Sequence, residues 1–183
     1  PIIGNDTINS TDLIRRRWLD NHFGGLTYSL NYAASNKLNL TLGGGYNLYE
    51  GDHFGEIIWS EIAANTSIRE RYYDNVGKKL DFNSYLKADY AITENLTAFA
   101  DLQVRAIDYS TNGNDNDLRI IDVEEAFLFF NPKAGINYRF NSITSAYVSY
   151  SVSNREPVRN DFIDAPVGEK PEHEQLNNLE FGV

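Results

Sequence analysis

The sequence predicts an all-β protein, an antiparallel up-and-down meander of about seven strands. Apolar and polar residues alternate with a period of two along several segments, the pattern of strands with one apolar face. The chain carries 12 Tyr and 10 Phe although its mean hydropathy is negative, and this composition suits such strands better than a helix bundle. Short turn-like stretches join the segments in pairs, so hairpins are expected.

The first predicted hairpin joins residues 26–32 to residues 38–48 through the turn-like stretch ASNK. A second hairpin joins residues 80–92 to residues 96–106 through TEN, and the strand over 96–106 stays apolar on one face throughout. The apolar side chains of these four strands occupy even-numbered positions: Leu26, Tyr28, Leu30, Tyr32, Leu38, Leu40, Leu42, Tyr46, Leu48, Leu80, Phe82, Leu86, Tyr90, Leu96, Leu102 and Val104.

The third predicted hairpin joins residues 127–140 to residues 145–153 through NSIT, and LNNLEFGV at 176–183 supplies a last strand. Pro132 lies in the middle of the first of these strands. Because proline lacks the N–H that a strand ladder requires, we expect a bulge or a strand boundary there. The glycines of LTLGGGY lie inside a strand and do not open a helix, so they form no phosphate loop. We expect them to leave room on the sheet or to mark a bend.

The connections at the other ends of these strands are long and polar, over roughly 50–72, 109–121 and 154–174. One end of the sheet therefore has tight turns and the other has long loops. This asymmetry is typical of transmembrane β-barrels, which have short periplasmic turns and long external loops.

Alternation alone fits two architectures. In a soluble antiparallel β-sandwich the apolar face packs on a second sheet, whereas in a transmembrane β-barrel it contacts lipid. Strand length favours the barrel, because the segments 38–48, 80–92 and 96–106 reach the nine to eleven residues, roughly, that a tilted strand needs to cross a bilayer. We therefore predict part of a transmembrane β-barrel. The alternative is a soluble sandwich that serves as a binding module, with carbohydrate as its candidate ligand.

Composition excludes several classes of protein. A formal net charge of −10 argues against a nucleic-acid partner, because phosphate-binding surfaces need clustered Lys and Arg. The chain has no Cys and so no disulfide or thiolate metal site. The longest apolar run, AFLFF at 126–130, is too short for a membrane helix. Because the chain begins PIIGND, we expect that a leader was removed or that the gene product continues upstream.

Several segments resemble the β-barrel of TonB-dependent outer-membrane receptors, of the type common in Bacteroidetes. They are RRRWLDNHFGG with YSLNYAASNKLNLTLGGGYNLYEGDHFGEIIW, and FFNPKAGINYRF with AYVSYSVSNREPVRNDF. The resemblance covers most of the chain. It implies a single segment, 1–183, of the C-terminal barrel of such a receptor in the cell outer membrane, with the plug domain absent from this chain.

The resemblance also implies a function. Such a receptor binds a scarce ligand at its external loops, and a plug shift driven by TonB lets the ligand through. A ferric siderophore is the leading ligand class, followed by cobalamin or an oligosaccharide. The partners implied are outer-membrane lipid, TonB through the missing plug, and the small-molecule ligand, and no cofactor is expected.

Two groups of candidate site residues follow. Charged side chains on the polar face of the strands are expected to face the barrel lumen: Lys87, Asp89, Asp101, Arg105, Lys133 and Arg139. External-loop residues are candidates for ligand contact: His53, Arg155 and Arg159. The arginines suit an anionic iron chelate, although local ion pairs that stiffen a loop are the simpler role for them and the one that the pattern favours.

No catalytic or metal site is expected. The chain lacks Cys, and its three His residues have no consistent Ser or Asp partner, so we expect no enzyme. His53 lies near Asp52 and Glu56, but one His among scattered carboxylates is a weak metal signal. The stretch NGNDND at 112–117 resembles a calcium loop in composition and lacks the spacing that an EF-hand needs.

Overall fold

A computed structural model of the protein describes residues 2–3, 6–7, 10–62, 67–166 and 168–183. Seven strands form one antiparallel sheet in chain order, and this confirms the predicted meander. A separate two-stranded sheet pairs β1 with β2, and one short helix, α1, follows β8. The bounds are β1 Ile2–Ile3, β2 Asp6–Thr7, β3 Leu13–Ala33, β4 Leu38–Ser60, β5 Arg71–Ala91, β6 Leu96–Asn114, β7 Ile120–Arg139, β8 Ser145–Arg155, α1 Arg159–Asp164 and β9 Glu174–Gly182.

The strands run through two compact units, which are described separately. Unit 1 comprises Pro1–Phe23, Tyr49–Lys78 and Tyr109–Glu124. Unit 2 comprises Gly24–Leu48, Lys79–Asp108 and Glu125–Val183. Unit 2 therefore contains the three short turns together with β8, α1 and β9.

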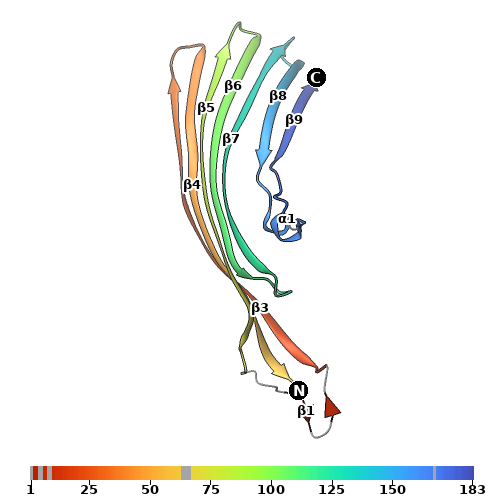
Figure 1. The fold of residues 1–183 in the computed structure, drawn as a ribbon. Helices are drawn as coiled ribbons and strands as arrows, with labels where there is room; N and C mark the ends of the chain where they lie inside the picture. The colour runs from red at the N-terminus through yellow and green to blue at the C-terminus, as the bar shows by residue number, and fades with distance from the viewer. Residues whose placement is uncertain (1, 4–5, 8–9, 63–66, 167) are drawn as a thin grey trace. The chain divides into compact units, whose positions relative to one another are not determined.

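The three short turns are confirmed. They connect β3 to β4, β5 to β6 and β7 to β8, and they lie at the same end of unit 2 (Figure 1). Each is closed by a backbone N–H that donates to the carbonyl four residues later: Ala34 to Leu38 at 2.9 Å, Ile92 to Leu96 at 2.9 Å and Phe140 to Thr144 at 3.0 Å.

Two of the three long connections are shorter than predicted. Most of 50–72 and of 109–121 is strand, so that only 61–70 and 115–119 connect the strands of unit 1. Pairing continues there, since the Ile57 N–H donates to the Glu70 carbonyl at 3.2 Å. The prediction was wrong because Asn, Asp and Gly disfavour strands only weakly, and sheet pairing overrides that preference.

The third connection, 156–173, is confirmed as a loop, and it contains the helix α1. Of the two alternatives expected at Pro132, the strand boundary is contradicted, because β7 continues through that residue. The register between β7 and β8 runs from Arg139 opposite Ser145 to Lys133 opposite Ser151. Beyond it, the Asn154 N–H donates to the side-chain oxygen of Asn131 at 3.0 Å. A side chain thus provides a backbone partner beside the proline.

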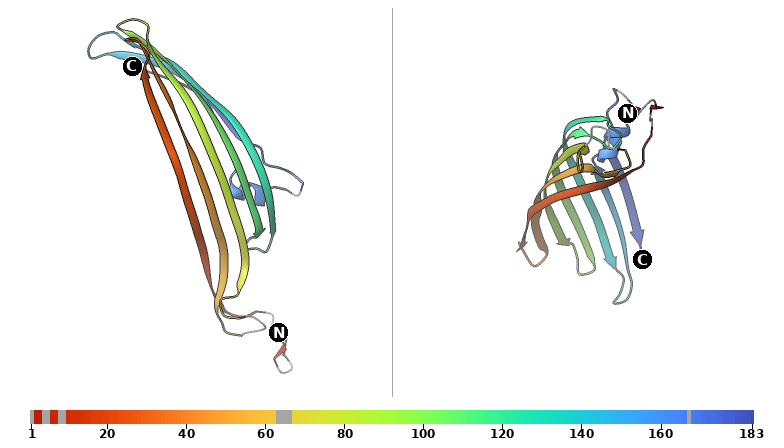
Figure 2. Two further views of the ribbon diagram at one scale, coloured as in Figure 1. Left: turned by 90° about the vertical axis from the view of Figure 1, so that its left-hand side faces the viewer. Right: turned by 90° about the horizontal axis from the view of Figure 1, so that it is seen from below.

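The apolar face of unit 2 is exposed. Its strands form one layer (Figure 2), and the side chains of Leu30, Leu102 and Leu179 are 64%, 48% and 65% exposed. Among the described residues, only five large apolar or aromatic side chains are buried: Phe54, Tyr73, Ile107, Ile121 and Phe129. Because no second layer covers the apolar face in the part of the chain described, the soluble sandwich is contradicted and the barrel wall is favoured.

Two tyrosine hydroxyls on the exposed apolar face are paired with polar side chains. The Tyr28 hydroxyl donates to Ser84 Oγ at 2.8 Å, and the Tyr150 hydroxyl donates to Asn177 Oδ1 at 2.7 Å. An unsatisfied polar group in hydrocarbon costs several kcal/mol. The pairs therefore allow Ser84 and Asn177 to lie among apolar side chains.

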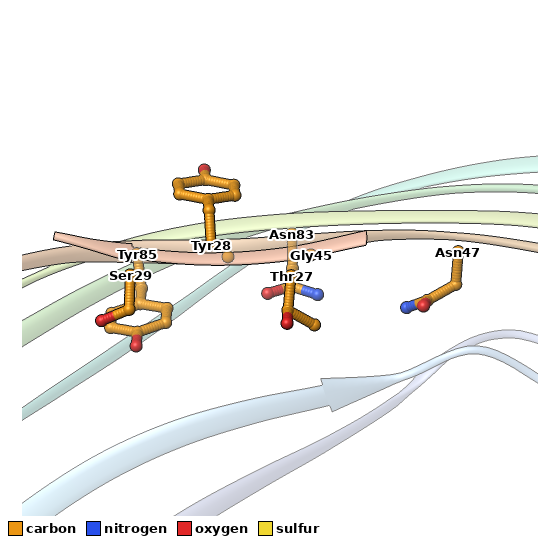
Figure 3. Close-up of a pocket in the computed structure, with 8 residues that line it drawn as sticks. Thr27, Tyr28, Ser29, Gly45, Asn47, Asn83 and Tyr85 are labelled. Atoms are coloured by element: carbon orange, nitrogen blue, oxygen red, sulfur yellow. The ribbon is translucent and has the colours of Figure 1, made fainter. Parts of the chain in front are cut away.

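The glycines of β4 leave room for two tyrosines, as expected. A Cβ added to Gly43 would overlap the hydroxyl end of Tyr85. One added to Gly44 would overlap the backbone carbonyl oxygen of Asn83 and lie 2.7 Å from the Tyr28 hydroxyl. The tyrosines project from opposite faces of the sheet (Figure 3). Each of the two consecutive glycines therefore leaves space for a tyrosine on its own face of the sheet.

We predict that Gly43→Ala and Gly44→Ala each destabilise the intact protein by about 1–3 kcal/mol, because the added methyl group must displace Tyr85 in the first variant and the Asn83 backbone together with Tyr28 in the second. The measurement is the urea midpoint of unfolding from lipid vesicles. Gly45→Ala is the matched control, since its Cβ would meet nothing closer than 3.5 Å. Equal midpoints for all three variants would contradict this account.

We also predict that Leu102→Lys destabilises the membrane-inserted protein by about 2 kcal/mol or more, because a lysine on the lipid face must leave water. Gln103→Lys, one residue along on the polar face, loses one hydrogen bond and should cost about 1 kcal/mol. Comparing the two unfolding midpoints checks the assignment of the faces. A larger loss for the Gln103 variant would reverse it.

Candidate functional site

Four charged side chains of unit 2 form an ionic cluster, defined here as Lys79, Asp81, Arg105 and Glu156. The Arg105 guanidinium lies 2.5 Å from Asp81 Oδ2 and 3.0 Å from Glu156 Oε2. Lys79 Nζ also contacts Glu156, and it lies 3.8 Å from Asp81. All four side chains are at most 30% exposed. The cluster therefore joins β5 and β6 to the loop that follows β8.

The electrostatics of the ionic cluster favour the charged form of Glu156. Burial raises the pKa of its carboxyl group, but the hydrogen bond from Lys79 and the charges of Lys79 and Arg105 outweigh burial. The pKa of Glu156 consequently lies below its ordinary value. The carboxylate is ionised at neutral pH, so the contact is a true ion pair.

A chain of side-chain amides crosses four strands of unit 2. Asn131 Nδ2 donates to Gln103 Oε1 at 3.0 Å, Asn154 Nδ2 donates to Asn131 Oδ1 at 2.9 Å, and Gln175 Nε2 donates to Asn154 Oδ1 at 3.2 Å. These residues lie on β6, β7, β8 and β9. Because each amide uses its neighbour as a partner, this chain ties the wall together and leaves little capacity for a ligand.

Unit 1 contains an Arg–aromatic cluster, defined here as Arg16, Trp18, Phe54, Glu56 and Arg71. The Arg16 guanidinium lies 2.6 Å from the Glu56 carboxylate and 4.8 Å from the centre of the Trp18 ring. Trp18 and Phe54 stack with their ring centres 6.2 Å apart, and the Arg71 guanidinium lies 3.6 Å from the Phe54 ring centre. Cations and rings therefore alternate across β3, β4 and β5.

Three more arginines of unit 1 lie next to the Arg–aromatic cluster along the chain: Arg15, Arg17 and Arg69, all exposed. Within the described residues none of the three forms a salt bridge, although Arg15 lies 5.5 Å from the ring centre of Tyr72. The Arg69 N–H donates to the Ile57 carbonyl at 2.8 Å, which brings it beside Glu56. Unit 1 thus carries guanidinium groups with unused donors.

A pocket of about 400 Å³ opens on the polar face of unit 2. The side chains that point into it carry no charge, and Tyr28 projects to the other side of the sheet (Figure 3). Of the chain that the structure describes, these side chains make no hydrogen bond to other side chains, so their donors and acceptors are available to a ligand. They are Thr27, Ser29, Asn47, Asn83 and Tyr85.

A tight turn connects β6 to β7 in unit 1. Asp115 Oδ1 accepts hydrogen bonds from the N–H groups of Asp117 and Arg119 at 2.9 and 2.8 Å, and Oδ2 accepts from Arg119 Nε at 2.8 Å. Burial raises the pKa of Asp115, but these hydrogen bonds and the Arg119 charge lower it further than burial raises it. The carboxylate closes the turn. Because both of its oxygens accept hydrogen bonds within the turn, it offers no calcium site.

The residues predicted to face the lumen are placed as follows. Arg105 belongs to the ionic cluster, Lys87 pairs with Asp89 at 3.0 Å, and Lys133 Nζ lies 5.7 Å from the Phe99 ring centre. Arg139 donates to the Glu94 carbonyl at 2.9 Å and so secures a short turn. Asp101 has a buried Oδ1 with no hydrogen-bond partner among the described residues. Their orientation toward a lumen stays a prediction.

The residues predicted to contact ligand do not all lie in loops. His53 lies within β4 in unit 1, where its Nε2 is 3.2 Å from the Tyr49 hydroxyl, so its assignment to an external loop was wrong. Arg155 ends β8 and pairs with Glu174 at 2.8 Å, and Arg159 begins α1. The sheet pairing of unit 1 extends β4 past the position at which the loop was expected to begin.

Sequence reasoning missed Glu156 as a partner of Arg105 and missed the Arg–aromatic cluster. The stretch RRRW at 15–18 offered a signal for that cluster, because three consecutive arginines are unusual in an acidic chain. No sequence signal pointed to the contact between Glu156 and Arg105, since the two residues lie 51 positions apart along the chain.

Neither a metal site nor a spanning helix is found in the described ranges. No group of three or more His, Cys, Asp or Glu side chains lies close enough together to hold a metal ion. The same residues contain no helix with the length and apolar character needed to cross a membrane.

An exposed apolar face, an opposite face of ion pairs and amides, and hairpins with short turns at one end define the wall of a transmembrane β-barrel. The family model described as TonB dependent receptor-like, beta-barrel, matches residues 2–183, and the chain belongs to this family. No curated protein matches the chain.

Membership of the family gives the coarse function. TonB-dependent receptors are transport proteins of the outer membrane and not enzymes, and they act together with TonB. The chain is therefore part of an outer-membrane transport receptor.

We predict that the turn at 115–119 opens in acid. Because the pKa of Asp115 is lowered in the folded chain, its contribution is fully present above an unfolded pKa of about 3.9 and is lost as the pH falls through the lower folded value. Hydrogen exchange of these amides, compared between neutral pH and about pH 3 after correction for the intrinsic rate, measures the opening.

Asp115→Asn should remove this pH dependence and weaken the turn by about 1.5–3 kcal/mol at neutral pH, because charged hydrogen bonds are lost. Asp117→Asn is the control, since the Asp117 side chain is 69% exposed and comes no closer than 3.8 Å to Arg119, which makes a weak ion pair. Equal exchange in both variants would show that Asp115 does not close the turn.

Proposed function

We propose that the intact receptor takes up an anionic iron chelate, a ferric siderophore or a similar scarce ligand, and that the arginines of unit 1 make the first contact. The observation that carries the proposal is the concentration of arginine and aromatic side chains at the ends of β3, β4 and β5 in an otherwise acidic chain. Five residues supply these guanidinium groups: Arg15, Arg16, Arg17, Arg69 and Arg71.

The chemistry of these side chains supports an anionic ligand. A guanidinium group offers several N–H donors that match carboxylate or catecholate oxygens, and it keeps its charge at every physiological pH. Arg16 and Arg71 are held by carboxylates and rings, whereas Arg15, Arg17 and Arg69 keep exposed donors. The aromatic rings provide flat apolar surface for a chelate with aromatic groups. His53, Arg155 and Arg159 are further proposed ligand contacts.

We further propose that residues 1–183 form one segment of the C-terminal barrel, and that the plug through which TonB acts is a separate domain. Two features support this. The sheet has β3 and β9 as its edges and does not close on itself in the described ranges. Exposed edges pair readily with further strands, so the remaining barrel strands are proposed to continue from both sides.

A second candidate ligand is a neutral oligosaccharide. The uncharged pocket of unit 2 favours it, because Thr27, Ser29, Asn47 and Asn83 present hydroxyl and amide groups beside the ring of Tyr85. These are the groups that bind a hydroxyl-rich, neutral molecule.

We predict that replacing Arg15, Arg17 and Arg69 together by Gln lowers the affinity of the intact receptor for a ferric tris-catecholate chelate at least tenfold. Each lost charge-assisted hydrogen bond is worth about 1.5–3 kcal/mol, and exposure to solvent reduces that value. Binding is measured by quenching of tryptophan fluorescence, and uptake by iron-limited growth of cells that carry each variant.

Arg139→Gln is the matched control, because that arginine secures a short turn and should leave binding unchanged. Unchanged binding in the triple variant would contradict the proposal. Binding of a maltooligosaccharide that Asn83→Ala abolishes, with no binding of the chelate, would establish the second candidate instead.

A further inference from the structure

The carboxylate of Glu156 lies between two cations of the sheet. Lys79 Nζ contacts its Oε1 atom, and the Arg105 guanidinium donates to Oε2 at 3.0 Å and to Oε1 at 3.3 Å. Only 12% of the Glu156 side chain is exposed. The three residues all belong to unit 2, but Glu156 alone belongs to the loop between β8 and β9 (Figure 1).

Two other contacts of this loop lie beyond α1. Lys170 Nζ lies 2.5 Å from the Glu125 carboxylate, with the lysine 67% exposed. The ring of His173, immediately before β9, lies 5.4 Å from the ring centre of Phe129. Exposed ion pairs contribute little. The better-buried contact of Glu156 therefore anchors the start of the loop to the sheet.

The strands hold the two cations in place without help from the loop. Asp81 accepts hydrogen bonds from Arg105 Nε at 3.1 Å and from Nη2 at 2.5 Å, and it lies 3.8 Å from Lys79. If Glu156 withdrew, Lys79, Asp81 and Arg105 would remain with one uncompensated positive charge. A fixed guanidinium beside an ammonium group is a preorganised site for a carboxylate.

We propose that Lys79 and Arg105 form a binding site for a carboxylate-bearing anion on the polar face of the sheet, and that Glu156 occupies it until such an anion takes its place. Exchange of one carboxylate for another then releases the loop over residues 156–173. The inference rests on the proposed function and deepens it, because an anionic ligand that has entered the receptor would itself release the loop by displacing Glu156.

Hydrogen exchange of the purified full-length receptor in detergent tests the loop without any ligand. Glu156→Gln should raise the exchange rate of amides in 157–166 about tenfold, which corresponds to the loss of one charge-assisted contact. Glu174→Gln is the matched control, because that carboxylate pairs with Arg155 on the surface at 66% exposure, and its exchange should change less than twofold. Equal rates in both variants would overturn the proposal.

Citrate tests the anion site directly. Wild-type receptor in citrate should show the same accelerated exchange in 157–166 as Glu156→Gln, whereas equal ionic strength of NaCl should accelerate it less. Isothermal titration should give at least tenfold tighter citrate binding to Glu156→Gln than to wild type, and the double variant Glu156→Gln with Arg105→Gln should lose it. Citrate that leaves wild-type exchange unchanged, or that binds the double variant equally well, would overturn the site.

The two proposals fail separately. Loss of chelate binding on replacement of Arg15, Arg17 and Arg69 concerns unit 1 and does not depend on Glu156. If that experiment fails while citrate still displaces Glu156, the anion site stands without the uptake proposal. If Glu156→Gln does not fold, the citrate effect on wild-type exchange decides the proposal alone.

Discussion

Hydrogen bonding of the backbone in hydrocarbon is the constraint on which the rest of this structure depends. A strand within a bilayer must find every backbone partner on its neighbours, because lipid offers none. The meander from β3 to β9 meets this requirement with consecutive hairpins, and the alternation of side chains then gives one face to lipid and the other to water. The same requirement is met beside Pro132, which has no backbone N–H: there the side chain of Asn131 accepts a hydrogen bond from the Asn154 N–H.

The two faces are organised differently as a consequence. On the lipid face apolar side chains need no partners, and the polar ones pair, as Tyr28 does with Ser84. On the polar face, ion pairs and amides connect strands that are neighbours in the sheet, and Glu156 connects them to a loop. Of these interactions, the ion pairs of Glu156 are the ones that we propose a ligand exchanges, because their chemistry is that of a carboxylate-bearing anion.

Much of the fold could be predicted from the sequence, because turns and alternation are local signals. The three short turns and the seven strands were predicted correctly. The continuation of β4 to Ser60 was not, because the alternation of apolar and polar residues ends near Tyr49, where the strand enters unit 1. Arg105 was identified as a polar-face residue from its position alone. Its partner Glu156 could not be, because that contact requires the loop after β8 to return to β5 and β6.

The central claim is that the apolar face of unit 2, to which β6 contributes its even-numbered residues, contacts acyl chains. The chain has no Cys, so single cysteines introduced at positions 100–104 of the reconstituted receptor can each carry a spin label whose collisions with oxygen and with a water-soluble nickel chelate are measured. The account predicts that oxygen accessibility is highest at 100, 102 and 104 and falls at 101 and 103, with the nickel chelate excluded from the even positions. Equal accessibility at all five positions, or the opposite alternation, would contradict it.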